Sequence, residues 1–108
     1  MQLAETIALA PTPARSIPLL EAGATLPIER TETLTTSRDD QETLPLNIVQ
    51  GTTPLTRLEF PIQKRGPRGI IKITLTLRVS LSGELSLSLI EQGTSNVLDR
   101  GGLAVLIR

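Results

Sequence analysis

The segment TLPIERTETLTTSRDDQETLPLNIVQG, residues Thr25–Gly51, contains two runs of residues that alternate in character. In the first run Glu32, Leu34 and Thr36 share one face, and in the second Leu44, Leu46 and Ile48 do. Side chains of a strand point alternately to its two faces, so each run predicts a half-buried strand. The charged residues SRDDQET between the runs predict a solvated loop. On this pattern alone the favoured interpretation is a hairpin.

The remaining chain continues the pattern of short alternating strands on both sides of this segment. Further strands are predicted at Thr6–Ala10, Ile17–Leu20, Leu58–Ile62, Ile71–Val79 and Leu85–Leu89. Turns are predicted at Thr52–Pro54 and Ser82–Gly83. Val97–Leu98 is too short to predict a strand firmly. A last apolar run, Leu103–Ile107, follows Gly101–Gly102. No segment has uninterrupted helical spacing of apolar residues. The sequence therefore predicts an all-β fold: an antiparallel β-sandwich of about eight short strands in one domain, 1–108, without a helical lid.

Composition excludes several classes of function. The 108 residues contain no cysteine and no histidine, which removes disulfides, thiolate or imidazole metal sites and Ser–His or Cys–His catalysis. Asp39 and Asp40 are adjacent carboxylates on a loop, without a partner for acid–base work. We therefore expect no catalytic residue, no metal site and no cofactor.

Charge and hydropathy argue against nucleic-acid and membrane partners. Eleven basic and eleven acidic residues cancel, and Phe60 is the only aromatic residue available to stack on a base. No apolar run is long enough to span a membrane, and the first residues, MQLAETIALAP, lack the basic region of a signal peptide. We expect a cytoplasmic protein, and the start at the edge of a strand suggests a piece of a longer chain.

One loop has a composition that permits a second kind of ligand. Gln63–Gly69, QKRGPRG, is basic and rich in glycine and proline, and backbone N–H groups in such a loop can cradle an anion. A solvated connection between strands is the favoured interpretation.

Four blocks, taken in order, resemble the β-sandwich substrate-binding subdomain of the DnaK-type (seventy-kilodalton) heat-shock chaperones. The blocks are TLPIERTETLTT, SRDDQ, LPLNIVQG and GPRGIIKITLTLRVSLSGELSLS, and the resemblance covers residues 6–91. It implies a module that binds short extended apolar peptides of unfolded or nascent chains in a channel at one end of the sandwich. It also implies an ATPase domain elsewhere in the full-length protein. No phosphate-binding loop occurs within these residues, so we expect no ATP control here.

The resemblance also implies which residues contact the peptide. A pocket for a leucine-like side chain falls on Leu9, Leu34, Leu44, Leu46 and Ile73. Thr12 and Ser37 correspond to the arch over the peptide backbone, and Thr35 and Gln41 complete the peptide-binding set. Without the resemblance, aliphatic residues on inward faces of a sandwich are core residues by default.

Departures from the family pattern leave two interpretations open. Leu34 stands where the family typically carries an aromatic residue, Thr12 and Ser37 are polar where arch residues are commonly apolar, and Pro45 lacks a backbone donor. The first interpretation is a client-binding chaperone module. The alternative is a DnaK-like domain that binds no clients and docks a fixed co-chaperone segment, as lidless members of ribosome-associated chaperone complexes do.

Overall fold

The computed structural model describes residues 1–12 and 15–108, and the side chains of residues 11–16 lie outside the description. Eight strands form the described chain: β1 (Ile7–Thr12), β2 (Arg15–Leu20), β3 (Ile28–Thr35), β4 (Thr43–Gln50), β5 (Thr53–Pro61), β6 (Lys72–Val79), β7 (Glu84–Glu91) and β8 (Val97–Ala104). Within these residues there is no helix, and so none that is long and apolar enough to cross a membrane. The predicted all-β fold is confirmed.

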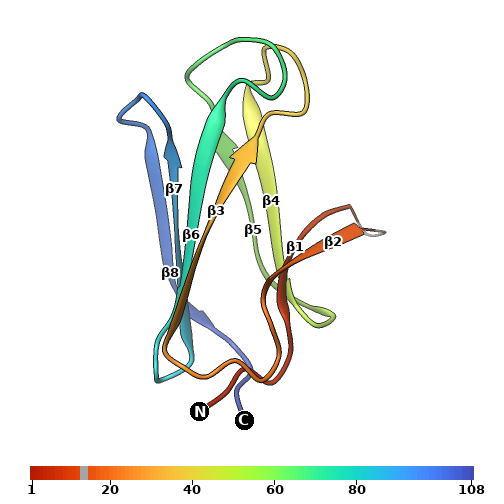
Figure 1. Ribbon diagram of the computed structural model, residues 1–108, viewed down its shortest axis with the longest axis vertical. Helices are drawn as coiled ribbons and strands as arrows, with labels where there is room; N and C mark the ends of the chain where they lie inside the picture. The colour runs from red at the N-terminus through yellow and green to blue at the C-terminus, as the bar shows by residue number, and fades with distance from the viewer. Residues whose placement is uncertain (13–14) are drawn as a thin grey trace.

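The strands form two antiparallel four-stranded sheets. The first has the order β2-β1-β4-β5 and the second the order β3-β6-β7-β8. Figure 1 shows the two sheets face to face over most of their length, with the β1–β2 pair splayed outward on one side. This is the predicted β-sandwich.

The hairpin predicted for Thr25–Gly51 is wrong. β3 pairs along its whole length with β6, and β4 pairs with β1 and β5, so the two strands of this segment belong to different sheets. The polar loop between them crosses from one sheet to the other (Figure 1). Alternation reports which residues face inward, but it carries no information about the partner strand, and a sandwich satisfies the same pattern as a hairpin.

Two predicted strand boundaries are also corrected. β5 begins at Thr53 and not at Leu58, because the turn is already complete at Gly51, with φ 59°, and Thr52. Pro54 fits into β5 because this is an edge strand. β8 runs through Gly101–Gly102 without ending there. The β7–β8 register shifts between Leu85 and Leu87, and Gly102 has φ 72°, so the glycines form a bulge in an edge strand.

The core is almost wholly aliphatic. Its one aromatic side chain is Phe60, which is fully buried and lies opposite Leu44 in the β4–β5 pair. The inward residues of the long strand β6 are Ile73, Leu75, Leu77 and Val79, all at most 1% exposed. At the tight β6–β7 turn, Gly83 has φ 80°, and a Cβ there would lie 3.2 Å from the Ile107 side chain. The turn thus needs glycine for both backbone and packing reasons.

The two ends of the chain lie side by side at one end of the sandwich (Figure 1). Backbone hydrogen bonds join Gln2 and Arg108 in both directions, at 3.0 and 2.9 Å. The fully buried Gln50 side chain reinforces this pairing: its amide donates to Leu106 O at 2.8 Å, and its oxygen accepts from Leu106 N at 2.6 Å. Gln50 therefore joins the first sheet to the C-terminal segment.

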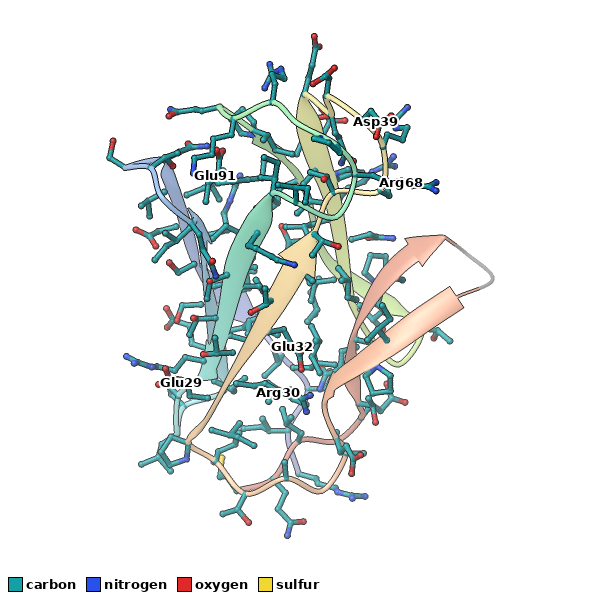
Figure 2. The ribbon with its side chains drawn as sticks, turned by 45° about the horizontal axis from the view of Figure 1, so that its top comes forward. Glu29, Arg30, Glu32, Asp39, Arg68 and Glu91 are labelled. Atoms are coloured by element: carbon teal, nitrogen blue, oxygen red, sulfur yellow. The ribbon has the colours of Figure 1, made fainter. Side chains whose placement is uncertain are left out.

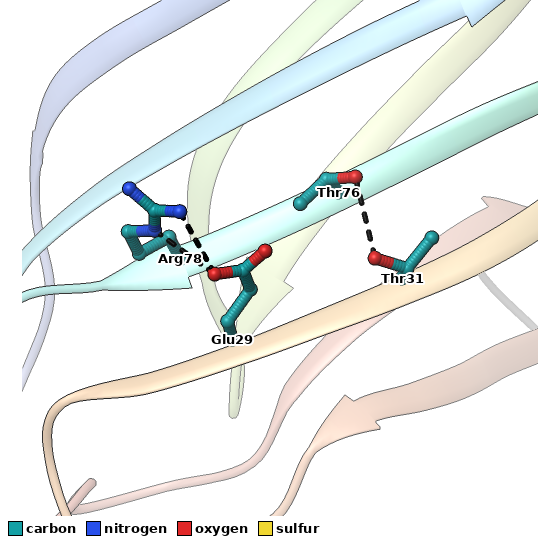
Figure 3. A network of polar contacts seen from close by, with 4 residues as sticks. All are labelled: Glu29, Thr31, Thr76 and Arg78. Carbon is teal, nitrogen blue, oxygen red and sulfur yellow. Dashed lines mark hydrogen bonds and ion pairs between the residues drawn. The ribbon is translucent and has the colours of Figure 1, made fainter.

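The outer face of the second sheet is polar. Figure 3 shows Arg78 donating from Nη2 and Nε to Glu29 Oε2, at 2.8 and 3.2 Å, across the β3–β6 pair. Beside them the hydroxyls of Thr31 and Thr76 lie 3.4 Å apart. These exposed contacts align β3 with β6, although exposed ion pairs stabilise by about 1 kcal/mol at most.

Candidate functional site

Three loops gather at the end of the sandwich opposite the termini (Figure 1). They are residues 36–42 between β3 and β4, residues 62–71 between β5 and β6, and residues 92–96 between β7 and β8. β3 therefore ends, and β4 begins, at this loop end. The resemblance implied a channel at one end of the sandwich, and most of the implied residues lie on these strands and loops.

The five implied pocket residues belong to one hydrophobic cluster. Leu9 is 6%, Leu46 2% and Ile73 0% exposed, so these three side chains are packed inside the core. Leu34, opposite Ile73 in the β3–β6 register, and Leu44 are only half-buried. The structure thus brings the five together, and leaves two of them, on different sheets, in contact with solvent.

The polar residues of the implied set take different positions. Thr35 is exposed at the end of β3, opposite Lys72, and Ser37 is exposed in the following loop. Gln41 is 7% exposed: its Oε1 accepts from the backbone N–H groups of Ser37 and Arg38 at 2.9 and 3.3 Å, and its Nε2 donates to Thr43 O at 2.6 Å. These bonds hold the loop in shape. Thr12 is the last residue of β1, and its side chain lies outside the described part.

One side of β4 is unpaired near the loop end, as far as the described residues go. The register of β1 with β4 covers Ile48–Gln50, whereas β5 pairs with β4 along its whole length. The stretch Thr43–Asn47 therefore presents an open backbone edge in the described chain. Pro45 lies in this stretch, where a residue without an N–H is tolerated. Its ring also removes one donor that an added strand could use.

Backbone and side-chain bonds link the first two loops. Asp39 Oδ1 accepts from Arg68 N at 2.9 Å, and Asp40 N donates to Gly66 O at 2.9 Å. Thr36 contributes both its carbonyl and its hydroxyl oxygen to Gly69 N, at 2.9 and 3.2 Å. Figure 2 shows Asp39 and Arg68 together at this end of the molecule. These hydrogen bonds join the two loops to each other.

Glu91 is a buried carboxylate that sequence reasoning missed. It is 0% exposed at the end of β7, and it accepts hydrogen bonds from Gln63 N at 2.7 Å, Lys64 N at 2.9 Å and Asn96 Nδ2 at 3.1 Å. Burial alone raises the pKa of Glu91, but these hydrogen bonds and the Lys64 charge outweigh it and lower the pKa below the ordinary 4.5. The sequence contained a signal for this burial, because Glu91 continues the alternation of the inward residues Leu85, Leu87 and Leu89.

Comparison with known proteins finds sequence similarity to chaperone proteins named DnaK. The chain is 30% identical over 84 residues to the chaperone protein DnaK of Picrophilus torridus, and 29% identical over 84 residues to that of Elusimicrobium minutum. Each match covers 71% of this chain and 14% of the relative, so the chain spans about one seventh of the length of these relatives. No model of a known protein family matches the chain.

The similarity and the fold agree with each other. DnaK of Thermoplasma volcanium, at 27% identity, matches over the same share of this chain as the two relatives above. The two antiparallel sheets are those expected from the resemblance. In sequence and in fold the chain is therefore similar to the substrate-binding β-sandwich of DnaK-type chaperones.

Proposed function

We propose that this domain is a non-catalytic chaperone module that binds short extended apolar peptide segments at its loop end. The observation that carries the proposal is the pair Leu34 and Leu44. They are half-buried leucines on opposite sheets, both at the loop end, in a chain similar to DnaK. Covering the solvent-accessible part of a half-buried leucine with a peptide side chain contributes on the order of 1 to 2 kcal/mol by burial of apolar area.

The open edge of β4 supports the same proposal. Extended peptides are commonly bound by main-chain hydrogen bonds to an unpaired strand, which gives affinity for many sequences, while side-chain pockets give limited specificity. Thr43–Asn47 offers such an edge beside Leu44 in the described part of the chain. Pro45 limits the number of main-chain bonds, so we expect the peptide to bind weakly and to exchange quickly.

The proposal is tested with a labelled leucine-rich heptapeptide and two matched variants. Leu34→Ser with Leu44→Ser should weaken binding about tenfold, because the apolar contact is lost on both sheets. Leu98→Ser with Leu103→Ser is the control, since both are half-buried leucines packed on the same core but lie on β8. Fluorescence anisotropy gives the affinities and circular dichroism the folded fraction. Equal affinity of both double variants and wild type contradicts the proposal.

Substitutions of the fully packed pocket residues, such as Leu46→Asp, would not test peptide binding. Leu46 is 2% exposed, so a carboxylate there would be buried without a partner and would unfold the domain. Loss of binding by that variant would report loss of the fold. Half-buried positions avoid this ambiguity.

One observation favours the second candidate, a domain that docks a fixed co-chaperone segment. Leu9, Leu46 and Ile73, which would line a deep leucine pocket, are already packed in the core. A shallow surface suits a single matched partner better than varied clients. A stoichiometric complex that excess leucine-rich peptide does not displace would favour this candidate over client binding. Displacement by the peptide would favour the first.

A further inference from the structure

A hollow at the loop end is lined by cations and by one exposed apolar side chain. It lies between residues 62–71 and residues 92–96, with a volume of about 380 Å³, and is lined by Lys64, Arg65, Ile70, Lys72, Gln92 and Gly93, with the buried Ile71 beneath. We call it the cationic hollow. Ile70 is 64% exposed, and no carboxylate is among the lining residues.

Within the described residues no cation of the cationic hollow forms a salt bridge with a carboxylate, although the Lys64 charge acts on the buried Glu91. The two ion pairs of the described residues lie elsewhere and join Arg30 to Glu32 and Arg78 to Glu29. Neither involves Lys64, Arg65 or Lys72. Glu91 lies below, fully buried and occupied by the N–H groups of Gln63 and Lys64. The charges of Lys64, Arg65 and Lys72 together with that of Glu91 give this site a net charge of plus two. The site is formed by two loops and the first residue of β6.

The loop geometry holds these cations in place. Arg65 donates from Nη1 to Ile62 O and Lys64 O, at 2.5 and 3.2 Å, and Lys72 Nζ donates to Gly69 O at 3.2 Å. Gly93 has φ 79°, and a Cβ on it would occupy the space of the Lys64 ammonium group. The bare glycine therefore lets Lys64 lie across the β7–β8 loop. The ammonium groups of Lys64 and Lys72 keep donors for a ligand.

The cationic hollow adjoins the proposed peptide site. Lys72 lies opposite Thr35 on the outer face of the β3–β6 pair, and the next residue, Ile73, lies opposite both Leu34 and Glu91 on the inward face. The beginning of β6 thus separates Leu34 from the cationic hollow by a single strand. A few residues of extended chain, at about 3.3 Å each, span two neighbouring strands, which lie about 4.8 Å apart.

We propose that the cationic hollow binds an acidic residue flanking the apolar segment of a bound peptide, with Lys64 and Lys72 pairing its carboxylate and Ile70 contacting a neighbouring apolar side chain. This inference rests on the proposed function and assigns it a preference: apolar segments followed or preceded by Asp or Glu. The exposed isoleucine favours peptide over nucleic acid, because phosphates need no apolar contact. The chain as a whole also has zero net charge.

The test compares two peptides on the full chain: the leucine-rich heptapeptide extended by two aspartates, and the same peptide extended by two asparagines. The aspartate form should bind about three- to tenfold tighter at low salt, the range of two exposed ion pairs. The difference should vanish near 1 M salt, where the Debye length is about 3 Å. Amide resonances of Gln92 and Gly93 should shift only with the aspartate form. Equal affinities of the two peptides overturn the inference.

Two variants and a matched control locate the effect. Lys64→Gln with Lys72→Gln should abolish the aspartate preference and leave the asparagine form unchanged; Arg65 is kept because it bonds the loop backbone. Arg57→Gln with Arg100→Gln changes the charge equally on β5 and β8 and should preserve the preference. Gly93→Ala, which displaces the Lys64 ammonium group, should reduce it. A preference that survives in the Lys64/Lys72 variant contradicts the assignment.

The experiment separates failure of this inference from failure of the proposed function. If both extended peptides bind equally, the cationic hollow has no such role and peptide binding stands. If neither extended peptide binds, but a short Asp-Asp-Ile peptide shifts the amide resonances of Gln92 and Gly93, the proposed apolar peptide site is wrong and the cationic hollow still binds acidic residues. If oligouridylate shifts these resonances at lower concentration than any acidic peptide, the ligand is a nucleic-acid phosphate and the inference is wrong.

Discussion

Single buried polar residues hold together segments that are far apart in this chain. Glu91 binds the backbone of the β5–β6 loop, and Gln50 binds the C-terminal segment, each from an inward position on a strand. A buried donor or acceptor that loses its partner costs about 1 to 3 kcal/mol. Such residues therefore decide the shape of the loops as well as the stability of the sandwich.

Glu91 gives the loop end a dependence on pH. Its pKa is lowered in the folded chain, so its contribution to stability is present above the ordinary 4.5 and is lost as pH falls through the lower folded value. Wild type should lose free energy of unfolding in this window, measured by urea denaturation. Glu91→Gln, which gives up an acceptor oxygen, should be about 1 to 3 kcal/mol less stable at pH 7 and should lack this pH-dependent loss. Glu59→Gln, exposed on β5, should behave as wild type.

Gln50 permits a second test at this scale. Gln50→Leu fills about the same space but leaves the Leu106 N–H without a partner, while the Leu106 carbonyl keeps its bond from Ala4 N at 3.0 Å, so we expect a loss of about 1 to 3 kcal/mol. Hydrogen exchange should report faster exchange of the Leu106 amide than in wild type. Gln63→Leu, at an exposed position, controls for the change of residue type. Unchanged protection of Leu106 in Gln50→Leu would contradict the assigned contact.

At the scale of elements, β6 is the strand on which the second sheet depends. It pairs with β3 on one side and β7 on the other, and its inward residues fill the middle of the core. The edge strands β2, β3, β5 and β8 contain proline, charged residues or a glycine bulge. These features limit the pairing of edge strands with other chains.

Leu75→Ala should therefore be strongly destabilising. The side chain is 1% exposed, and removing it leaves a cavity, with an expected cost of about 2 to 5 kcal/mol in chemical denaturation. Leu81→Ala is the matched control: Leu81 is 60% exposed in the β6–β7 turn, and the change should stay within about 0.5 kcal/mol. Similar effects of the two substitutions would contradict the placement of β6.

At the scale of the whole molecule, the sandwich has two structurally different ends. One end pairs the two chain termini, and the other carries the three loops (Figures 1 and 2). The half-buried Leu34 and Leu44 and the cationic hollow lie at the loop end as well. Leu3 is 0% exposed and bridges to Ile107, so the N-terminal residues are part of the core.

Removal of residues 1–4 should destabilise the whole domain. It deletes the Leu3 side chain and the backbone bonds to Leu106, Arg108 and Ala24, and a buried leucine alone is worth about 2 to 5 kcal/mol. The measurement is the free energy of unfolding in urea. Met1→Ala serves as the control, because Met1 is 64% exposed. An equal stability of the shortened and intact chains would show that the terminal pairing contributes nothing.

The sequence alone determined most of the strands, the aliphatic core and the resemblance to DnaK, but it gave only a weak signal for β8. Period-two alternation is a local property, and it located β6 and β7 almost to the residue. Partner strands depend on contacts between residues far apart in the chain, so only the tertiary structure separated β3 from β4 into two sheets. For the same reason the alternation of Leu46 and Ile73 predicted inward faces but could not tell a pocket wall from a filled core. Glu91, a carboxylate among inward leucines, found its partners only when the β5–β6 loop folded over it.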